Sequence, residues 1–226
     1  MKRPIISPSV LNADLIHFDN EVKKIKDAGM KWIHFDVMDG HFVEAVKFEL
    51  PLLKELCPKV DLFRDVHIMI DNPLQMVEKF KEVGAHQLTF HYEACKDDKE
   101  VFETINKIHK CGMKAGISIK PKTPVEKVYP FLKELDVVLV MSVEPGRGGQ
   151  KFMEQSLERI NNLRNEIDRV NAKAMISVDG GINDITGPKC LNAGADILVV
   201  GQYLFGHEDF FDRYERLVKQ CKTPSF

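Results

Sequence analysis

The sequence predicts an α/β protein that folds as a single (β/α)8 barrel, a TIM barrel, over residues 1–226. Three observations predict it. Strand-like and helical segments alternate eight times along the chain, and strict alternation is typical of a parallel sheet. A length of 226 residues suits a barrel built around one core. No charge block, proline-rich tract or low-complexity linker marks a second domain.

The predicted strands are short segments whose apolar residues follow the pattern typical of β-strands. They lie near Ile5–Ser9, Trp32–Asp36, Phe63–Met69, Gln87–His91, Lys114–Ile119, Val137–Met141, Ala174–Asp179 and Ile197–Val200.

Helical patterns separate these strands, and several carry start and stop signals. Pro73 stands at a first-turn position, and Gly29, Gly84 and Gly112 each follow the end of a helical pattern, as C-terminal caps do. The predicted helices are Asp14–Ala28, Pro51–Leu56, Pro73–Val83, Lys99–Cys111, Pro124–Leu135, Met153–Val170, Thr186–Asn192 and Phe210–Lys219.

Net charge, cysteine pattern and apolar runs indicate which partners and which cellular compartment to expect. A net charge of −2 gives no electrostatic reason to expect nucleic acid or an anionic membrane. Five scattered cysteines without a CxxC pair favour a reducing compartment. The chain begins Met1-Lys2-Arg3-Pro4 without a hydrophobic signal region, and no apolar run approaches the ~20 residues of a membrane helix. We therefore expect a cytoplasmic protein.

Metal-ligand residues stand in three of the predicted strands. His34 and Asp36 point to the same face of one strand because side chains alternate with period two. His67 lies on the next strand, and Asp179 ends the seventh. Two imidazoles and two carboxylates from distant strands converge only in a closed or strongly curved sheet. The pattern predicts a divalent-metal site that includes catalytic acids.

Glycine-rich segments follow the last three predicted strands. They are Pro145–Gln150, Asp179–Asn183 and Val199–Gln202. Glycines let backbone N–H groups turn toward an anion, and barrels often bind phosphate in the loops after strands seven and eight. Because the carboxyl ends of barrel strands form one mouth, we expect a phosphate site beside the metal site, with Ser9 and Met141 at the same mouth.

Taken in order, these segments resemble the ribulose-phosphate 3-epimerase family. The resemblance runs from the first to the last predicted strand at family-like spacing, so it is highly specific. The matching stretches are Ser7-Pro8-Ser9, His34-Phe35-Asp36-Val37-Met38-Asp39-Gly40-His41-Phe42-Val43, Val66-His67-Ile68-Met69, Val143-Glu144-Pro145-Gly146, Gly148-Gly149-Gln150-Lys151-Phe152, Val178-Asp179-Gly180-Gly181-Ile182 and Val200-Gly201.

The resemblance implies a barrel of the ribulose-phosphate-binding type and an isomerase that interconverts D-ribulose 5-phosphate and D-xylulose 5-phosphate by inversion at C3, in the pentose phosphate pathway. It implies one divalent metal ion, zinc first and iron, manganese or cobalt as alternatives, and a homo-oligomer. His34, Asp36, His67 and Asp179 are the implied ligands, and Asp36 and Asp179 the two acid/base groups. The implied substrate contacts are Ser9, His67, Met141, Gly146, Arg147, Gly148, Gly149, Asp179, Gly180, Gly181, Gly201 and Gln202.

The chemistry of these residue types supports the same reaction. The C3 proton of a 2-ketose lies next to the carbonyl, so its removal yields an enediolate, whose charge a divalent cation stabilises as a Lewis acid. Inversion needs one group on each face of the planar intermediate, and two carboxylates meet that need. Met38, Met69 and Met141 are interpreted either as an apolar lining of the site or as ordinary core residues.

Three positions depart from the family pattern. Arg147 stands where an aromatic residue is usual, and Gln202 where a small serine is usual. The loop Val43–Phe48 lacks the usual Pro-Asn element. Arg147 either contacts the phosphate or faces solvent, whereas Gln202 removes a hydroxyl but keeps its backbone N–H.

Other readings remain open at this point. The nearest is an epimerase for a hexulose 6-phosphate such as allulose 6-phosphate. A non-catalytic phosphate-binding barrel and a metal-free lyase or decarboxylase are further alternatives; the last needs catalytic Lys or Glu at strand ends, where Lys120 is the nearest lysine. The residues interpreted as structural, turn or surface positions are Ser7, Asp39, His17, His41, His86, His91, His109 and His207.

Overall fold

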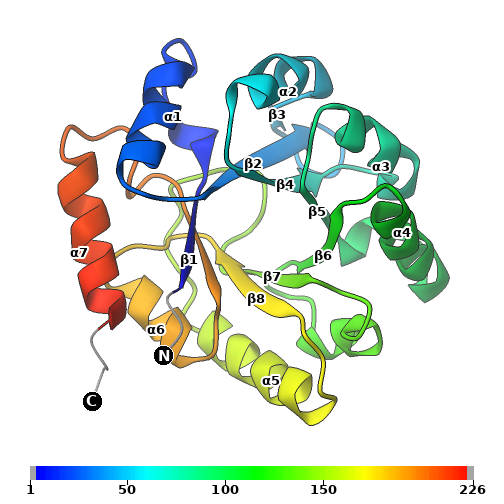
Figure 1. Ribbon diagram of the computed structural model, residues 1–226. Coiled ribbons are helices and arrows are strands. Elements are labelled where there is room, and N and C mark those ends of the chain that lie inside the picture. Colours follow the sequence, from blue (N-terminus) through cyan, green and yellow to red (C-terminus); the bar gives the residue numbers. More distant parts are fainter. Residues whose placement is uncertain (1–3, 223–226) are drawn as a thin grey trace.

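Eight parallel strands form the closed centre of the computed structural model, which describes residues 4–222 (Figure 1). The sheet order is β1-β9-β8-β7-β6-β5-β4-β2, and a parallel bridge between Ser9 and His34 joins β1 to β2 and closes the ring. The predicted (β/α)8 barrel is therefore confirmed. The strands are β1 (Ile5–Pro8), β2 (Trp32–Asp39), β4 (Phe63–Met69), β5 (Gln87–His91), β6 (Lys114–Ile119), β7 (Val137–Met141), β8 (Met175–Asp179) and β9 (Ile197–Val200).

Residues 1–3 and 223–226 lie outside the described part of the chain. They belong to the predicted single domain, and residues 1–3 also to the prediction about the N-terminal segment.

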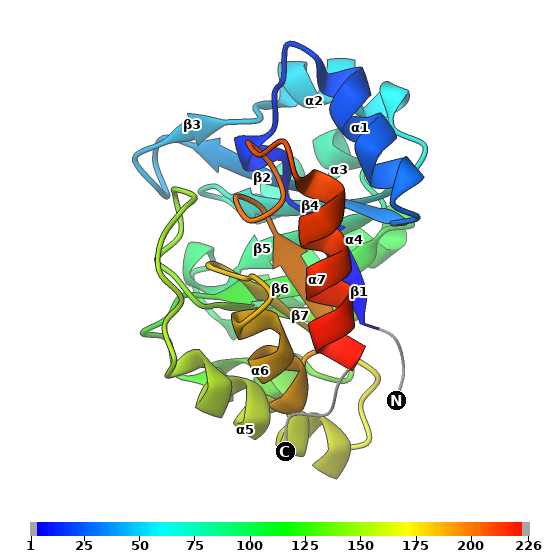
Figure 2. The same cartoon turned by 90° about the vertical axis from the view of Figure 1, so that its left-hand side faces the viewer.

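Helices surround the strands, as the sequence predicts, and Figures 1 and 2 show them on the outside of the barrel. The α-helices are α1 (Phe18–Asp27), α2 (Leu50–Leu56), α3 (Pro73–Glu82), α4 (Asp98–Lys110), α5 (Ser156–Arg169), α6 (Thr186–Asn192) and α7 (Phe210–Lys222). Short 3₁₀ helices occupy Val10–Asn12, Cys57–Lys59, Tyr92–Ala94 and Val125–Phe131.

The predicted helix Met153–Val170 begins later, at Ser156, and the predicted helix Phe210–Lys219 continues to Lys222. Two further differences have local reasons. The first begins at Phe18 instead of Asp14, because the Asp14 carboxylate accepts the backbone N–H groups of Ile16 and His17 in a turn before the helix. The segment predicted as the helix Pro124–Leu135 is a 3₁₀ helix. Pro130 lies inside it, and proline removes an N–H donor and crowds the preceding turn of an α-helix.

The loop after β2 contains a strand that the sequence did not reveal. β2 continues to Asp39, turns at Gly40 with φ +76°, and pairs antiparallel with the two-residue strand β3 (Val46–Lys47). Gly40 N–H donates to the carbonyl oxygen of Ala45 at 3.0 Å. The β2–β3 hairpin projects beyond the barrel at its carboxyl end (Figure 2).

Alternation along the strands separates the core from the site. On β2, Ile33 and Phe35 belong to the main hydrophobic core, while His34 and Asp36 are buried on the opposite, inner face. The barrel interior is polar along β2, β4 and β5. A separate small apolar cluster fills the other side, and its members are Leu139, Met141, Val143 and Val199.

We expect Phe35→Ala to lower the free energy of unfolding by about 3–5 kcal/mol, the cost of truncating a buried aromatic residue. Phe35 is 0% exposed and packs against Phe18 of α1 and edge-to-face against Phe48, so its removal leaves a cavity beneath β2. Urea unfolding followed by circular dichroism measures the loss. Phe211→Ala, at a residue that is 45% exposed, is the matched control and should change stability by less than about 1 kcal/mol.

Candidate active site

The four predicted metal ligands meet at the carboxyl end of the barrel. His34, Asp36, His67 and Asp179 each offer a ligand atom, and these atoms lie within 4.8 Å of one another. Asp36 and His67 are direct neighbours in the β2–β4 register, while Asp179 comes from β8 across the barrel. Two nitrogen and two oxygen donors form a set that suits zinc, iron, manganese or cobalt, so the residues fit a divalent ion.

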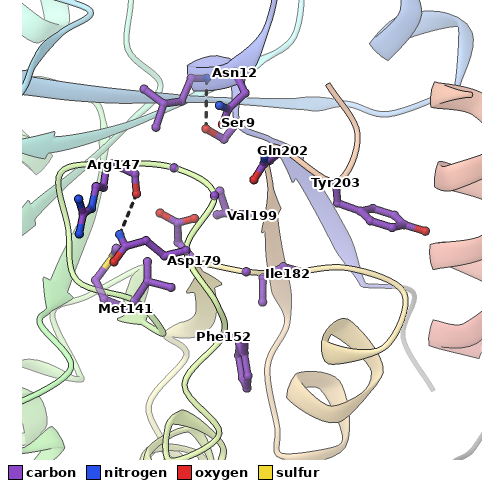
Figure 3. A pocket seen from close by; sticks show the side chains of 18 of the residues that line it. Ser9, Asn12, Met141, Arg147, Phe152, Asp179, Ile182, Val199, Gln202 and Tyr203 are labelled. Atoms are coloured by element: carbon purple, nitrogen blue, oxygen red, sulfur yellow. Dashed lines mark hydrogen bonds between the residues drawn. The ribbon is translucent and has the colours of Figure 1, made fainter. Parts of the chain in front are cut away.

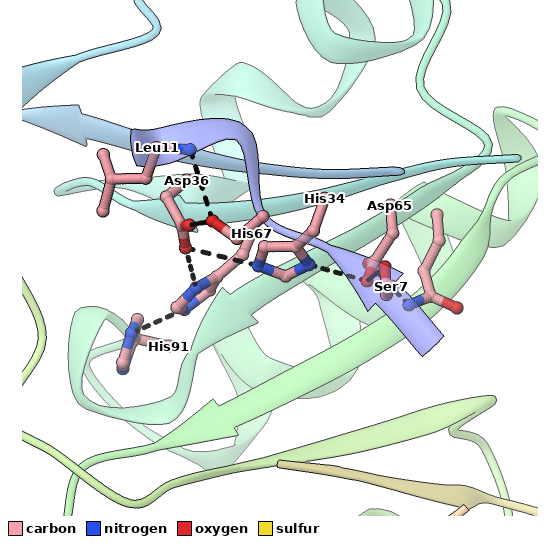
Figure 4. Close-up of polar contacts among 9 residues, drawn as sticks. Ser7, Leu11, His34, Asp36, Asp65, His67 and His91 are labelled. Carbon is pink, nitrogen blue, oxygen red and sulfur yellow. Dashed lines mark hydrogen bonds and ion pairs between the residues drawn. The ribbon is translucent and has the colours of Figure 1, made fainter. Parts of the chain in front are cut away.

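His34 is oriented by a carboxylate deeper in the barrel (Figure 4). Its Nδ1 lies 2.8 Å from Asp65 Oδ2, which leaves Nε2 directed at Asp36 Oδ1 at 3.2 Å. Asp65 in turn accepts a hydrogen bond from Gln87 Nε2 at 2.8 Å and a longer one from the Ser7 hydroxyl at 3.5 Å. A carboxylate behind a ligating histidine fixes the ring orientation and the nitrogen that faces the metal.

His67 is oriented through a second histidine. Its Nδ1 lies 3.1 Å from Asp36 Oδ1, and its Nε2 lies 2.9 Å from His91 Nε2. His91 Nδ1 lies 3.1 Å from Glu93 Oε2. Nitrogens of His34 and His67 therefore converge on the same oxygen of Asp36, as ligands around a shared ion do.

The side chains around Asp36 and Asp179 shift the pKa values of these two carboxyl groups in opposite directions. Burial favours the neutral form of Asp36, but the charge of the neighbouring His34 ring outweighs it and lowers the pKa of Asp36. Burial and the negative charge of Asp36 raise the pKa of Asp179 to about 7. Burial also opposes protonation of His34, yet Asp36 and Asp65 hold its pKa well above the usual range. Divergent pKa values suit one proton acceptor and one proton donor.

A cavity of about 470 Å³ opens above these carboxyl groups (Figure 3). Asp36 and Asp179 reach its wall, as do Met38, Met69 and Met141. His34 and His67 lie beneath the wall, 1% and 0% exposed. The methionines thus form an apolar lining around the carboxyl groups.

Ser9 also lines the cavity and is bound to the metal-ligand group. Its hydroxyl donates to Asp36 Oδ2 at 2.6 Å and accepts the backbone N–H of Leu11 at 3.4 Å. Ser9 thus donates its hydrogen bond to Oδ2 of Asp36, whereas the two histidines face Oδ1.

The glycine-rich loops form the opposite wall of the cavity. Gly180 and Gly181 have positive φ, +118° and +65°, and a Cβ on Gly181 would lie 2.6 Å from the backbone nitrogen of Phe152. The fold therefore requires glycine where the loop after β8 crosses the loop after β7. The predicted residues of these loops all line the cavity: Gly146, Arg147, Gly148, Gly149, Gly180, Gly181, Gly201 and Gln202.

The two departing side chains lie at the rim, away from the carboxyl groups. Arg147 is exposed there. The side chain of Gln202 extends from the loop after β9 toward the loop after β7, since a Cβ on Gly149 would lie 2.6 Å from Gln202 Oε1. In the described part of the chain, no hydrogen bond or ion pair joins either side chain to the four predicted metal ligands.

Comparison with known proteins identifies the relatives of this chain. The sequence model described as the ribulose-phosphate 3 epimerase family matches residues 5–205. The chain belongs to this family. It is 41% identical to a ribulose-phosphate 3-epimerase of Chlamydia pneumoniae, covering 89% of this chain and 87% of the relative. It is 39% identical to a ribulose-phosphate 3-epimerase of Bacillus subtilis, covering 90% and 93%. The expectation of an epimerase-family enzyme is confirmed.

Solved structures outside the ribulose-phosphate 3-epimerase family share the fold. Orotidine 5′-phosphate decarboxylase from Pyrococcus horikoshii superposes with a TM-score of 0.70 at 11% identity, covering 97% of this chain and all of that one. A 3-hexulose-6-phosphate synthase from Salmonella typhimurium gives 0.70 at 15% identity, covering 96% and 98%. At these identities the likeness shows the barrel alone. Within residues 4–222 no helix has the length and apolar character needed to span a bilayer.

Several polar residues of the site were missed from the sequence. Asp65, Gln87 and Glu93 were not singled out, and His91 and Ser7 were interpreted as structural. A usable signal existed for two of them, because Asp65 stands two residues before His67 and Gln87 stands four residues before His91. An even spacing on a strand places both side chains on the same face of the sheet. Glu93 lies in the 3₁₀ helix after β5, so the strand period gives no signal for it.

We expect the metal-free Asp179→Asn variant to be more stable than metal-free wild type at pH 8, and the difference to shrink toward pH 4. The folded-state pKa of Asp179, about 7, exceeds its usual value of 3.8, so its stabilising contribution is complete below about 3.8 and is lost as the pH rises through 7. Asparagine has no such titration. Thermal unfolding across this range should show a gain at pH 8 of about 2–4 °C or more, the shift of roughly 1 kcal/mol in a chain this long. A difference in unfolding temperature between Asp179→Asn and wild type that stays constant from pH 4 to pH 8 would contradict this prediction.

Proposed function

We propose that this protein is a metal-dependent isomerase that inverts C3 of D-ribulose 5-phosphate to give D-xylulose 5-phosphate, and the reverse. The observation that carries the proposal is the pair Asp36 and Asp179, a buried and a half-buried carboxyl group that belong to the cluster of four ligand side chains and lie on one cavity wall. Membership of the ribulose-phosphate 3-epimerase family supports the substrate and the stereocentre.

Asp36 and Asp179 are the proton carriers in this proposal. In one direction Asp36, held ionised by His34, removes the C3 proton from one face of the sugar, and neutral Asp179 returns a proton to C3 from the other face. In the reverse direction the two residues exchange roles. A divalent cation bound by these residues supplies Lewis-acid stabilisation for the negative charge that develops on the substrate oxygens.

The remaining cavity residues bind and shield the substrate. Backbone N–H groups of the loops at Gly146–Gly149, Gly180–Gly181 and Gly201–Gln202 hold the phosphate, with Arg147 at the rim. Ser9 contacts the sugar while it orients Asp36. The lining of Met38, Met69 and Met141 excludes water, so that bulk solvent does not protonate the planar intermediate on the wrong face.

The proposal also covers the metal ion, the oligomeric state, the compartment and the metabolic pathway. His34, Asp36, His67 and Asp179 hold one divalent ion; zinc is the proposed metal, and the donor set also accepts iron, manganese or cobalt. We further propose one catalytic domain over residues 1–226 that acts as a cytoplasmic homo-oligomer in the pentose phosphate pathway. The proposed partner is the phosphorylated ketopentose, without nucleic acid or membrane.

We expect the metal-loaded protein to exchange the C3 proton of D-ribulose 5-phosphate for deuterium in heavy water while D-xylulose 5-phosphate accumulates, as followed by proton NMR. Asp36→Asn and Asp179→Asn should each slow turnover by about 10²–10⁴-fold, since each removes a proton carrier. Asp71→Asn, at an exposed residue outside the cavity, is the matched control and should keep wild-type turnover.

Removal of the metal with a chelator should abolish turnover, and zinc should restore it. Exchange and inversion that are both absent from metal-loaded wild type would sink the epimerase proposal and leave the phosphate-binding barrel as the better reading.

We expect kcat/KM for D-ribulose 5-phosphate to exceed that for D-allulose 6-phosphate by at least about tenfold, the discrimination a well-fitted pocket obtains from one added carbon unit. The same cavity faces both sugars, so assays with equal enzyme and metal compare them directly. Faster turnover of the hexulose phosphate would assign the protein to the alternative substrate while leaving the two-carboxylate mechanism in place.

A further inference from the structure

A chain of three side chains leads away from the metal-ligand group, and its last two members have no part in the reaction described above. It runs from His67 on β4 to His91 at the end of β5 and on to Glu93 in the 3₁₀ helix that follows. His67 and His91 are both 0% exposed. Buried imidazoles must satisfy both ring nitrogens, so the positions of their protons are tied together.

Glu93 is the fixed end of this chain. Its Oε1 accepts the backbone N–H of Lys120 at 2.8 Å and the hydroxyl of Thr123, while its Oε2 faces His91 Nδ1 at 3.1 Å. Burial opposes its ionisation, but the hydrogen bond from His91 and the other donors lower the pKa of Glu93 to about 2. An ionised carboxylate only accepts hydrogen bonds, so the His91 nitrogen that faces it must carry the proton.

The proton positions follow in order from this end. A neutral His91 with its proton on Nδ1 has a bare Nε2, which accepts from His67 Nε2 at 2.9 Å. His67 then carries its proton on Nε2, and its Nδ1 keeps a free lone pair toward Asp36 and the metal-ligand group. Metal coordination needs that lone pair.

The opposite arrangement, with both protons shifted toward Asp36, is less favoured. Asp36 accepts the Ser9 hydroxyl at 2.6 Å on one oxygen, and His34 Nε2 already lies 3.2 Å from the other. Among residues 4–222, Glu93 Oε2 has no hydrogen-bond donor apart from His91. The proton on His91 therefore stabilises the structure more when it faces Glu93.

An aromatic cover keeps water from this chain. The Phe42 ring lies 4.7 Å from the His91 ring, and Lys120 Nζ lies 3.9 Å above the centre of Phe42. Phe42 comes from the loop after β2, and Lys120 follows β6, so two loops cover His91, which is 0% exposed. Water cannot replace the missing donor or acceptor there, and the fixed carboxylate decides the orientation.

We propose that Glu93 is a positioning residue that, through His91, sets the His67 tautomer with Nδ1 free for the metal ion. The inference rests on the metal site of the proposed function. It assigns to His91 and Glu93 the role that Asp65 has directly for His34. The two ligand histidines thus present different nitrogens, Nε2 of His34 and Nδ1 of His67.

The test is the Glu93→Gln variant, which keeps the size of the side chain. The amide oxygen can still accept from Lys120 and Thr123, which turns the NH₂ group toward His91 Nδ1 and reverses the proton order. We expect zinc affinity, measured by competition with a chromogenic chelator, to fall about 10–100-fold. Glu93→Asp, which keeps the carboxylate, should lose less. Glu21→Gln makes the same change at a buried glutamate of α1 and should leave zinc affinity at the wild-type level.

Long-range ¹H–¹⁵N correlation spectra of the metal-free proteins supply the second readout, because protonated and bare imidazole nitrogens differ in ¹⁵N shift. We expect His67 protonated on Nε2 in wild type and on Nδ1 in Glu93→Gln. Unchanged zinc affinity, or weaker affinity with an unchanged tautomer, would overturn the proposal. If Glu93→Gln does not fold, the wild-type spectrum still tests the proposal, because a proton on Nδ1 of His67 in wild type would overturn it. Neither readout needs epimerase turnover, so failure here and failure of the proposed function are distinguishable.

Discussion

Closure of the barrel between β1 and β2 is the constraint on which the site depends. The parallel bridge from Ser9 to His34 brings the end of the first strand beside the second, so that the Ser9 hydroxyl reaches Asp36. Closure also places Asp179, which lies at the end of β8, opposite Asp36. In an open sheet these two carboxyl groups would stand far apart, and neither would shift the pKa of the other.

A polar interior on one side of the barrel is costly, and the structure offsets that cost with hydrogen bonds. Burial of a charged group without a partner destabilises a fold by several kcal/mol. Asp36, Asp65 and Glu93 are each bound by at least two donors, and the histidines link them. The opposite side of the interior is apolar around Leu139 and Val199. The fold thus confines its charged groups to the region where a cation and an anionic sugar are expected.

Sequence reasoning recovered the barrel, the convergence of His34, Asp36, His67 and Asp179, and the glycine-rich wall, because each depends on a local period or spacing. It failed for features that are determined by contacts between distant parts of the chain. Nothing local distinguishes a 3₁₀ helix at Val125–Phe131 from a weak α-helix except Pro130, and the β2–β3 hairpin depends on where Val46 finds a partner. The roles of His91 and Glu93 depend on contacts between β4 and β5. A histidine at a strand end gives no sign of these contacts by itself.

Some cavity residues stand on strands and others on loops, and this difference determines which positions tolerate substitution. Its reactive groups stand on strands whose other face packs into the main core, so nearly any replacement there disturbs both chemistry and folding. Arg147 and Gln202 stand on loops at the rim, where the backbone follows from glycines and the side chains are exposed. Substitutions can therefore change the side chains of the rim without disturbing the packing of the strands.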